Sequence, residues 1–233
     1  MDRPATLRVS FIIPAYNEER TIEEVLERVS ELSLEKQIVV VDDGSTDRTP
    51  QILAGWADRD GVVVVSQRNQ GKGAAIRAAI PHLDGEIAVI QDADMEYDPS
   101  DVPRLVEPIM RGAADVVFGS RLRGGAPQRA HLYWHLVGNR FLSFVTCVLY
   151  NTTLSDMETG YKAFRTEVLR SLDLRQSDFS IEPEITGKVC KRGLRIYELP
   201  IAYYGRTYNE GKKITWRDGF KALWVLFRVR LAG

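Results

Sequence analysis

The chain has 233 residues, of which 31 are Lys or Arg and 32 are Asp or Glu, so its formal net charge is −1. This length allows a substantial core in one large domain, and the balanced charge gives no reason to expect a nucleic-acid partner. Cys147 and Cys190 lack metal-ligand spacing and predict buried thiols in a reducing cytoplasm. Residues 1–8 lack the apolar core of a signal peptide, and the run 141–150 is too short to span a bilayer, so no segment is expected to cross a membrane.

Strands and helices are predicted to alternate over the first half of the chain. A helix is predicted over 19–32, because its apolar residues recur with the spacing of one helical face. An Ala-rich helix is predicted to end at Ile80, and residues 42–47, DDGSTD, predict a turn into a helix N-terminus. Apolar runs predict strands over 7–13, 37–41, 62–65, 87–90 and 115–119. This alternation indicates an α/β fold with a mainly parallel sheet.

The stretch from Glu86 to Pro99, EIAVIQDADMEYDP, carries the clearest chemical signal. Its buried strand is followed at once by Asp92 and Asp94, at the position where open α/β sheets bind ligands. Two carboxylates so close together repel each other unless a cation lies between them, and carboxylate oxygens suit Mg²⁺ or Mn²⁺. Mg²⁺ is usually held by few carboxylates together with substrate phosphates, so the triplet predicts a metal and a phosphorylated substrate. An acidic loop that faces solvent is the alternative.

Two common classes of nucleotide-binding protein are not supported. Residues 68–73, RNQGKG, lack the spacing of a P-loop, and no GxGxxG follows the first strand. The sequence therefore favours neither an ATPase nor a Rossmann dehydrogenase. Lys72 can still reach a phosphate from this loop.

The composition changes at Ser120. Arg121, Arg123 and Arg129 surround two glycines and predict a flexible basic loop able to close over anions. His131 and His135 are four residues apart but have no acidic partner on that face, so we expect ordinary surface or packing histidines. Helices are predicted over 131–150 and 179–190 and a strand over 194–199, and the stretch 155–164, SDMETGYKAF, is expected to turn from polar residues to apolar packing after Gly160.

The C-terminal segment is basic and amphipathic. Residues 205–233 contain seven basic residues and two acidic ones, a net charge of +5. Apolar residues recur at helical spacing, and Arg217, Lys221 and Arg228 can flank them; the apolar set is Phe220, Leu223, Trp224, Phe227 and Leu231. This layout predicts an interfacial helix that docks on an anionic membrane surface. Packing of the same stripe on the domain, or on a second subunit in a homo-oligomer, is the alternative.

With these segments placed, the chain resembles glycosyltransferase family 2, and within it the polyprenyl-phosphate glycosyltransferases, the group that includes dolichol-phosphate mannose synthases. The resemblance rests on six stretches in the family's order: PAYNE (14–18), VDDGSTD (41–47), QDADMEYDP (91–99), GSR (119–121), SDMETGYKAF (155–164) and YYGRTYNEGKK (203–213). It implies a GT-A fold with a nucleotide-sugar-binding half (1–119), an acceptor half (120–204) and the basic C-terminal segment (205–233).

The resemblance also implies roles for individual residues. Pro14, Tyr16, Glu18, Val41 and Asp43 would hold the nucleoside, Asp92, Asp94 and Glu96 would hold the metal, and Arg121, Arg206 and Lys212 would face phosphates. Lys72 and Ala93 are expected to bind substrate as well. Some relatives carry Gln in place of Glu96. Asp94, Arg121 and Asp156 would be the catalytic residues.

The implied reaction is inverting transfer of one sugar from GDP-mannose, UDP-glucose or UDP-N-acetylglucosamine to a polyprenyl or dolichyl phosphate. The chain lacks the QxxRW signature of processive synthases, which favours single-sugar transfer, and it would work in the cytoplasm or on the cytoplasmic face of the membrane. A phosphate acceptor needs no strong base, since its second pKa is about 6. A hydroxyl acceptor would need one, and Asp156 is the candidate, with capping of the following turn as its alternative. A non-catalytic nucleotide-sugar-binding subunit is a further alternative.

Overall fold

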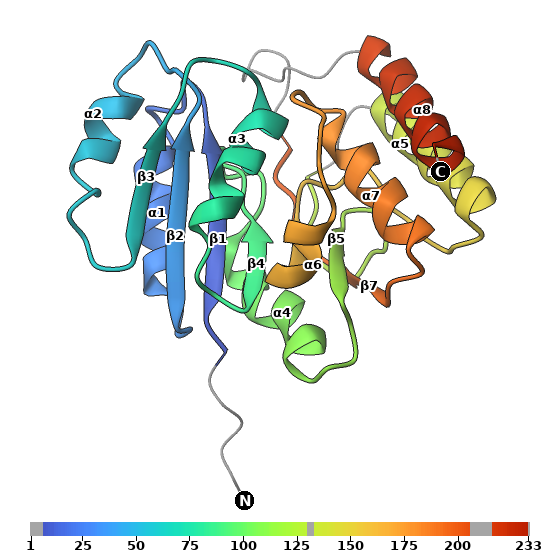
Figure 1. The fold of residues 1–233 in the computed structure, drawn as a ribbon, viewed down its shortest axis with the longest axis horizontal. Helices are drawn as coiled ribbons and strands as arrows, with labels where there is room; N and C mark the ends of the chain where they lie inside the picture. The colour runs from blue at the N-terminus through green and yellow to red at the C-terminus, as the bar shows by residue number, and fades with distance from the viewer. Residues whose placement is uncertain (1–6, 130–132, 206–215, 233) are drawn as a thin grey trace, which may run out of the picture.

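The structure, a computed structural model that describes residues 7–129, 133–205 and 216–232, is organised around one seven-stranded sheet (Figure 1). In the order β3-β2-β1-β4-β6-β5-β7, the strands are Val62–Ser66, Lys36–Asp42, Val9–Ala15, Ile87–Ile90, Lys162–Arg165, Val116–Ser120 and Ile196–Pro200. Strand β6 runs antiparallel to β4 and β5, and the other paired strands are parallel. The prediction of a mainly parallel sheet is confirmed.

Helices cover both faces of this sheet, which explains why its central strands are almost continuously apolar. On one face, α1 (Ile22–Glu31), α2 (Thr49–Ala54) and α4 (Val102–Met110) enclose one hydrophobic cluster. On the other, α3 (Lys72–Ala79), α6 (Thr166–Ser171) and α7 (Ile181–Lys191) enclose a second. Two short 3₁₀ helices, Ile80–His82 and Pro99–Asp101, follow α3 and precede α4.

Two further helices lie beside α7, outside the sheet (Figure 1). Helices α5 (Tyr133–Tyr150) and α8 (Trp216–Leu231) share a small cluster that includes Leu142, Ala222 and Leu226. The Tyr150 hydroxyl donates a hydrogen bond to the Leu226 carbonyl oxygen at 2.8 Å, which ties one helix to the other. In the part of the chain that the structure describes, no helix is both long enough and apolar enough to cross a bilayer.

Strand β6 and helix α6 differ from the sequence prediction, which expected only apolar packing after Gly160. The strand begins at Lys162, whose side chain is completely buried and forms an ion pair with Glu182 of α7. The strand could not be recognised from the sequence, because Lys162 interrupts the apolar run and the residue that neutralises it in the core lies 20 residues away in sequence.

The register of the parallel strands brings three loops to one edge of the sheet. Ala15 pairs with Asp42, so β1 and β2 end at the same level, whereas Ile90, the last residue of β4, pairs with Ile12, three residues before the end of β1. Tyr16 and Asp43 directly follow β1 and β2, and Asp92 follows β4 after Gln91, so all three residues lie at this edge of the sheet. The proposed division at residues 119 and 120 remains a prediction, and both halves contribute strands to the same sheet.

Candidate active site

A pocket of about 370 Å³ opens at the carboxyl edge of β1, β2 and β4. Ten of the predicted site residues line it: Pro14, Tyr16, Glu18, Asp43, Lys72, Asp92, Ala93, Asp94, Glu96 and Arg121. Val41 and Asp156 do not, because both side chains are buried outside the lining. Arg206 and Lys212 lie outside the described residues. The roles of all these residues stay predictions, but the fold brings most of them together in this pocket.

The loops after β1 and β2 hold each other in position. The Ser45 hydroxyl accepts a hydrogen bond from the Asn17 backbone N–H at 3.0 Å, and the Asn17 side-chain oxygen accepts one from the Thr46 N–H at 2.8 Å. The Glu18 N–H donates to the Thr49 hydroxyl at 3.0 Å. Asn17 has a φ of 55°, a left-handed conformation that Asn tolerates better than most residues. The PAYNE and DDGSTD stretches thus form one interlocked wall.

Asp43 organises the loop that leads into α3. Its Oδ1 accepts hydrogen bonds from the Gln67 side chain at 2.6 Å and from the Gln70 N–H at 2.9 Å, and its Oδ2 accepts one from the Gly71 N–H at 2.7 Å. Gly71 has a φ of 98°, and a Cβ there would lie 2.5 Å from the Ser177 carbonyl oxygen. Only glycine fits this position, from which α3 begins with Lys72.

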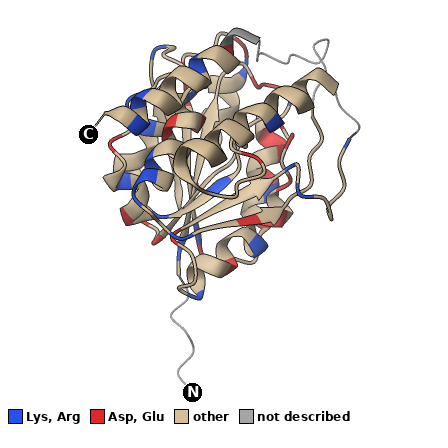
Figure 2. Cartoon of the chain, turned by 90° about the vertical axis from the view of Figure 1, so that its right-hand side faces the viewer, with Lys and Arg blue, Asp and Glu red and all other residues tan. Residues whose placement is uncertain are grey.

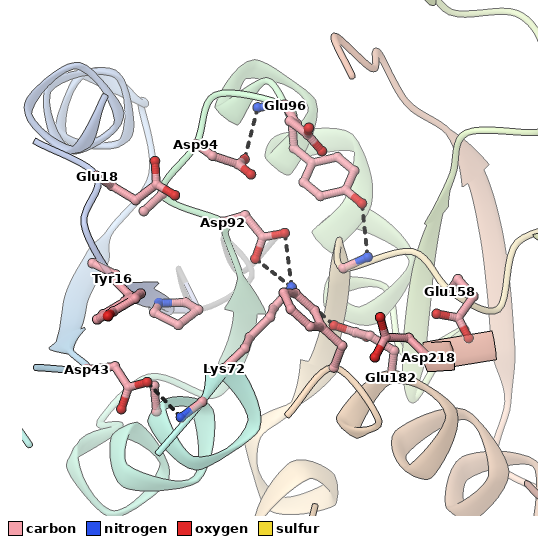
Figure 3. Close-up of a pocket in the computed structure, with 18 of the residues that line it drawn as sticks. Tyr16, Glu18, Asp43, Lys72, Asp92, Asp94, Glu96, Glu158, Glu182 and Asp218 are labelled. Carbon is pink, nitrogen blue, oxygen red and sulfur yellow. Dashed lines mark hydrogen bonds and ion pairs between the residues drawn. The ribbon is translucent and has the colours of Figure 1, made fainter. Parts of the chain in front are cut away.

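Lys72 connects the two sides of the pocket (Figure 3). Its Nζ lies 2.7 Å from Asp92 Oδ1 and 3.3 Å from Glu182 Oε1. Burial alone would lower the pKa of Lys72, but the charges of Asp92 and Glu182 outweigh it and raise the pKa above its ordinary value. The chain passes close to this pair at Gly160, where a Cβ would lie 2.7 Å from Asp92 Oδ2 and 2.9 Å from Lys72 Nζ. A permanent positive charge is therefore held at the end of β4.

The loop after Asp92 is also fixed by local contacts. The Ala93 carbonyl accepts a hydrogen bond from the Thr21 hydroxyl at 2.7 Å, and Asp94 Oδ1 accepts one from the Glu96 N–H at 3.2 Å. Met95 between them has a φ of 59°. The Tyr203 hydroxyl donates to Glu96 Oε2 at 3.0 Å.

Asp92 and Asp94 fit a divalent metal by the chemistry of their donor atoms. Both carboxylates lie in the pocket, and the ammonium of Lys72 beside Asp92 shows that the position favours a cation. Among the described residues, no three His, Cys, Asp or Glu side chains gather into a ready-made metal cluster. This donor set suits an ion that takes its other ligands from substrate phosphates and water.

Arg121 follows β5 and is oriented by Asp156. Its Nε and backbone N–H lie 2.7 and 2.9 Å from Asp156 Oδ2, and its Nη2 lies 2.8 Å from Oδ1. Burial would lower the pKa of Arg121, but the Asp156 carboxylate outweighs it and keeps the guanidinium charged. The guanidinium carbon also lies 5.2 Å from the centre of the Tyr203 ring. Asp156 is completely buried beneath this pair, while Arg121 faces the pocket.

Several lining residues were not predicted as site residues: Tyr97, His135, Glu158, Glu182 and Tyr203. The Tyr97 ring stacks on Tyr161, with centroids 5.0 Å apart, and its hydroxyl accepts a hydrogen bond from the Gly160 N–H at 3.0 Å. His135 was expected to be an ordinary surface or packing residue, but it lines the pocket from α5. Glu158 lies within the SDMETG stretch, so that motif was the available signal.

Comparisons with curated proteins identify some relatives of about the same length as this chain and others that are longer. A dolichyl-phosphate hexose transferase from Haloferax volcanii is 32% identical, covering 85% of this chain and 83% of that one. A UDP-N-acetylglucosamine–dolichyl-phosphate N-acetylglucosaminyltransferase from Methanococcus voltae is 27% identical over 96% of each chain. A dolichol-phosphate mannosyltransferase from Pyrococcus furiosus is 30% identical over 88% of this chain and 59% of that one. The chain spans about half to two thirds of the length of several such relatives.

A solved structure and a family model complete the comparison. Glucosyl-3-phosphoglycerate synthase from Mycobacterium tuberculosis, solved with Mn²⁺, UDP and glucosyl-3-phosphoglycerate, has a TM-score of 0.73 at 22% identity, covering 98% of this chain and 81% of that one. This likeness confirms the predicted GT-A fold. The model of glycosyl transferase family 2 matches residues 10–173, most of the described chain. The chain therefore belongs to glycosyltransferase family 2.

Proposed function

We propose that this protein is an inverting glycosyltransferase that moves one sugar from a nucleotide sugar to a polyprenyl phosphate. The main support is the pocket, where the carboxylates after β4 lie between the interlocked loops of β1 and β2 and the basic side chain of Arg121. A site with carboxylates for a metal on one side and a fixed cation on the other suits two phosphorylated substrates. Relatives named for transfer to dolichyl phosphate support the same acceptor class.

The donor would bind on the side of β1 and β2. The nucleoside would be contacted by Pro14, Tyr16, Glu18 and Asp43. Val41 could contact it only through its backbone, because the Val41 side chain is buried in the core. Lys72 and Ala93 would lie against the diphosphate. The base and the sugar stay open among GDP-mannose, UDP-glucose and UDP-N-acetylglucosamine, since the named relatives use different sugars.

Asp92 and Asp94, with Glu96, would hold Mg²⁺ or Mn²⁺, and Mn²⁺ is present in the solved structure of the related fold. Such an ion, when bound, would supply positive charge against the negative charge that develops on the leaving diphosphate. Lys72 would add a fixed positive charge beside the same carboxylate, 2.7 Å from Asp92, and so stabilise the departing nucleotide.

The acceptor would bind on the side of Arg121. Its guanidinium, held by Asp156, would pair with the phosphate, and Arg206 and Lys212 are proposed as further phosphate contacts. Because a phosphate monoester is largely ionised at neutral pH, with a second pKa of about 6, its oxygen can attack the sugar without a strong base. Asp156 would then serve to position Arg121, since both of its oxygens already accept hydrogen bonds from that residue.

We further propose that helices α5 and α8 dock the enzyme on an anionic membrane, as a peripheral protein of the cytoplasmic face. Eight apolar side chains on these helices are between 46% and 81% exposed: Trp134, Phe141, Phe144, Val148, Phe220, Trp224, Phe227 and Leu231. Figure 2 shows the side of the molecule on which these helices lie, with Lys and Arg segments in blue among the tan segments that carry no charge. The described basic residues of the pair are Arg140, Lys221, Arg228 and Arg230. Exposed aromatic side chains beside basic ones are typical of interfacial helices.

The same helices contribute to the pocket, which favours a membrane over another partner. His135, Leu136 and Asn139 of α5 and Asp218 and Ala222 of α8 line it. An acceptor whose chain stays in the lipid could therefore bring its phosphate to the pocket along these two helices.

The first test of the function is donor-dependent transfer to a polyprenyl phosphate, measured with each radiolabelled nucleotide sugar in Mg²⁺, Mn²⁺ or excess EDTA. We expect Asp94→Ala to reduce transfer by at least about 10²-fold, because it removes a group that stabilises the charge of the leaving diphosphate. Glu167→Gln, an exposed position on α6, is the matched control and should keep full activity. Full turnover by Asp94→Ala, or by the wild type in EDTA, would reject the metal-dependent mechanism.

A further inference from the structure

Glu158 is a pocket residue with one buried carboxyl oxygen that has no hydrogen-bond partner among the described residues. It lies between α5 and β6, and Figure 3 draws it on the same side of the pocket as Glu182 and Asp218, opposite Tyr16 and Asp43. The side chain is partly exposed to the pocket, whereas its Oε1 is buried and accepts no hydrogen bond from any described residue. Buried carboxyl oxygens without a partner are rare in folded proteins, so this one calls for an explanation.

The basic groups near Glu158 form ion pairs with other carboxylates. Lys162 of β6 forms an ion pair with Glu182 of α7, and Arg121 forms one with Asp156. Asp218 of α8 and His135 of α5 line the same pocket. Burial, helped by the nearby carboxylates of Glu182 and Asp156 and opposed by Lys162 and Arg121, raises the pKa of Glu158 to about 7. Near neutral pH the protonated and the ionised forms of this carboxyl group are therefore both populated.

We propose that Glu158 binds the acceptor phosphate as a neutral carboxylic acid and donates a hydrogen bond to one of its oxygens, while Arg121 supplies the positive charge. This inference rests on the proposed phosphate acceptor. An ionised Glu158 would repel the phosphate, whereas the protonated form offers a donor from a position where the protein provides none. A phosphate bound in the pocket would give this carboxyl group a hydrogen-bond partner that the described residues do not supply.

The proton stays on Glu158 during transfer. A different phosphate oxygen forms the new bond to the sugar carbon, the bond from that carbon to the nucleotide breaks, and the electron pair leaves with the diphosphate. Acceptor binding above neutral pH must therefore take up one proton, since both the free phosphate and the free Glu158 are then mostly ionised.

This proton uptake can be measured without catalysis. Farnesyl phosphate is titrated into the full chain by calorimetry at pH 8, in Tris and in HEPES, whose different heats of protonation report the protons exchanged. We expect nearly one proton taken up by the wild type, and an affinity that falls about tenfold per pH unit above pH 8. Glu158→Gln keeps a donor at every pH, so it should bind with no proton uptake and with an affinity independent of pH from 7 to 9.

Two further variants complete the experiment. Glu158→Ala, which has no donor, should weaken binding at pH 7 by about tenfold or more, the usual effect of losing a hydrogen bond to a charged group. Glu167→Gln should behave as the wild type, and thermal unfolding confirms that each variant is folded.

Three results would overturn the inference. Wild-type binding of farnesyl phosphate without proton uptake would reject the inference about Glu158 and leave the proposed function standing. Loss of binding and transfer in a folded Glu158→Gln would show that the ionised carboxylate is the working form, as a general base would require. Failure of the wild type to bind any prenyl phosphate, while it still binds a nucleoside diphosphate, would reject the proposed acceptor and this inference with it.

Discussion

At the scale of single residues, Glu158 links the chemistry of the pocket to the stability of the fold. Its ordinary pKa of 4.5 rises to about 7 in the folded protein, so ionisation favours the unfolded chain. This cost is absent below about pH 4.5, increases between the two pKa values and is constant above pH 7. Glu158→Gln removes the titration. We expect it to raise the free energy of unfolding at pH 8 by about 1–3 kcal/mol relative to the wild type, with no gain at pH 4.

Urea unfolding at both pH values measures this difference. Glu167→Gln again serves as the control, because its exposed side chain should give no pH-dependent change. An equal effect of Glu158→Gln at pH 4 and pH 8 would show that the carboxyl group is not perturbed in the folded protein.

Asp156 makes a different prediction. The sequence suggested it as a base for a hydroxyl acceptor, but its two oxygens are engaged by Arg121 at 2.7 and 2.8 Å. If its task is to orient Arg121, Asp156→Asn should lower transfer to a phosphate acceptor, and combining it with Arg121→Lys should cost much less than the two losses added together. A double-mutant cycle on kcat/KM measures this coupling. Additive losses would show that the two side chains act separately.

The site residues that could be predicted are those marked by a local sequence pattern. Asp92 and Asp94 follow a recognisable buried strand, so their place in the pocket could be expected. The SDMETG stretch contains Glu158 but does not distinguish it from its neighbours. The importance of Glu158 lies in an unpartnered oxygen, and the lack of a partner depends on Lys162 and Arg121 being paired with other carboxylates in three dimensions.

At the scale of helices, α8 has two different apolar faces. Ala222, Val225 and Leu226 are buried against the domain, while Trp224 and Phe227 are exposed. The predicted stripe is therefore largely on the outer face, where Arg228 lies 5.1 Å from the centre of the Trp224 ring. The sequence analysis treated membrane docking of the stripe and packing of the same stripe as alternatives. In the structure other residues of α8 pack on the domain, and most of the stripe is exposed.

A double variant tests whether this outer face binds membranes. Trp224→Glu with Phe227→Glu leaves the buried face intact, and we expect at least about tenfold weaker co-sedimentation with vesicles that contain phosphatidylglycerol, because each lost aromatic contributes about 1.5–3 kcal/mol of apolar burial. Wild-type binding should also weaken at 1 M salt, where the Debye length is about 3 Å.

Tyr197→Glu is the matched control, since Tyr197 is an exposed aromatic residue on β7. Equal sedimentation of the double variant and the wild type would exclude this face as the membrane contact. A wild-type dimer that dissociates in the double variant, without vesicle binding by either protein, would assign the face to a second copy instead.

The elements that sequence reasoning missed have a common physical cause. Helical spacing on α1 and the apolar run of β4 are local patterns, and both elements were predicted close to their observed bounds. Strand β6 depends on hydrogen bonds to β4 and β5 and on the burial of Lys162 against Glu182, none of which leaves a local pattern.

At the scale of the whole molecule, the alternation of strands and helices was sufficient to predict an α/β sheet. It could not give the strand order, because β6 enters between β4 and β5 although it follows both in sequence. Long-range pairing of this kind is decided by the total burial of both faces, which no single segment encodes.

The position of β6 has a mechanical consequence. This strand is hydrogen-bonded to β4 on one side and β5 on the other, so the strand that precedes Asp92 and the strand that precedes Arg121 belong to one continuous ladder. A clamshell opening about a hinge would have to break that ladder. If donor and acceptor bind on the two sides proposed here, we expect them to enter and leave by rearrangement of surface loops, because the ladder through β6 resists a change in the distance between those sides.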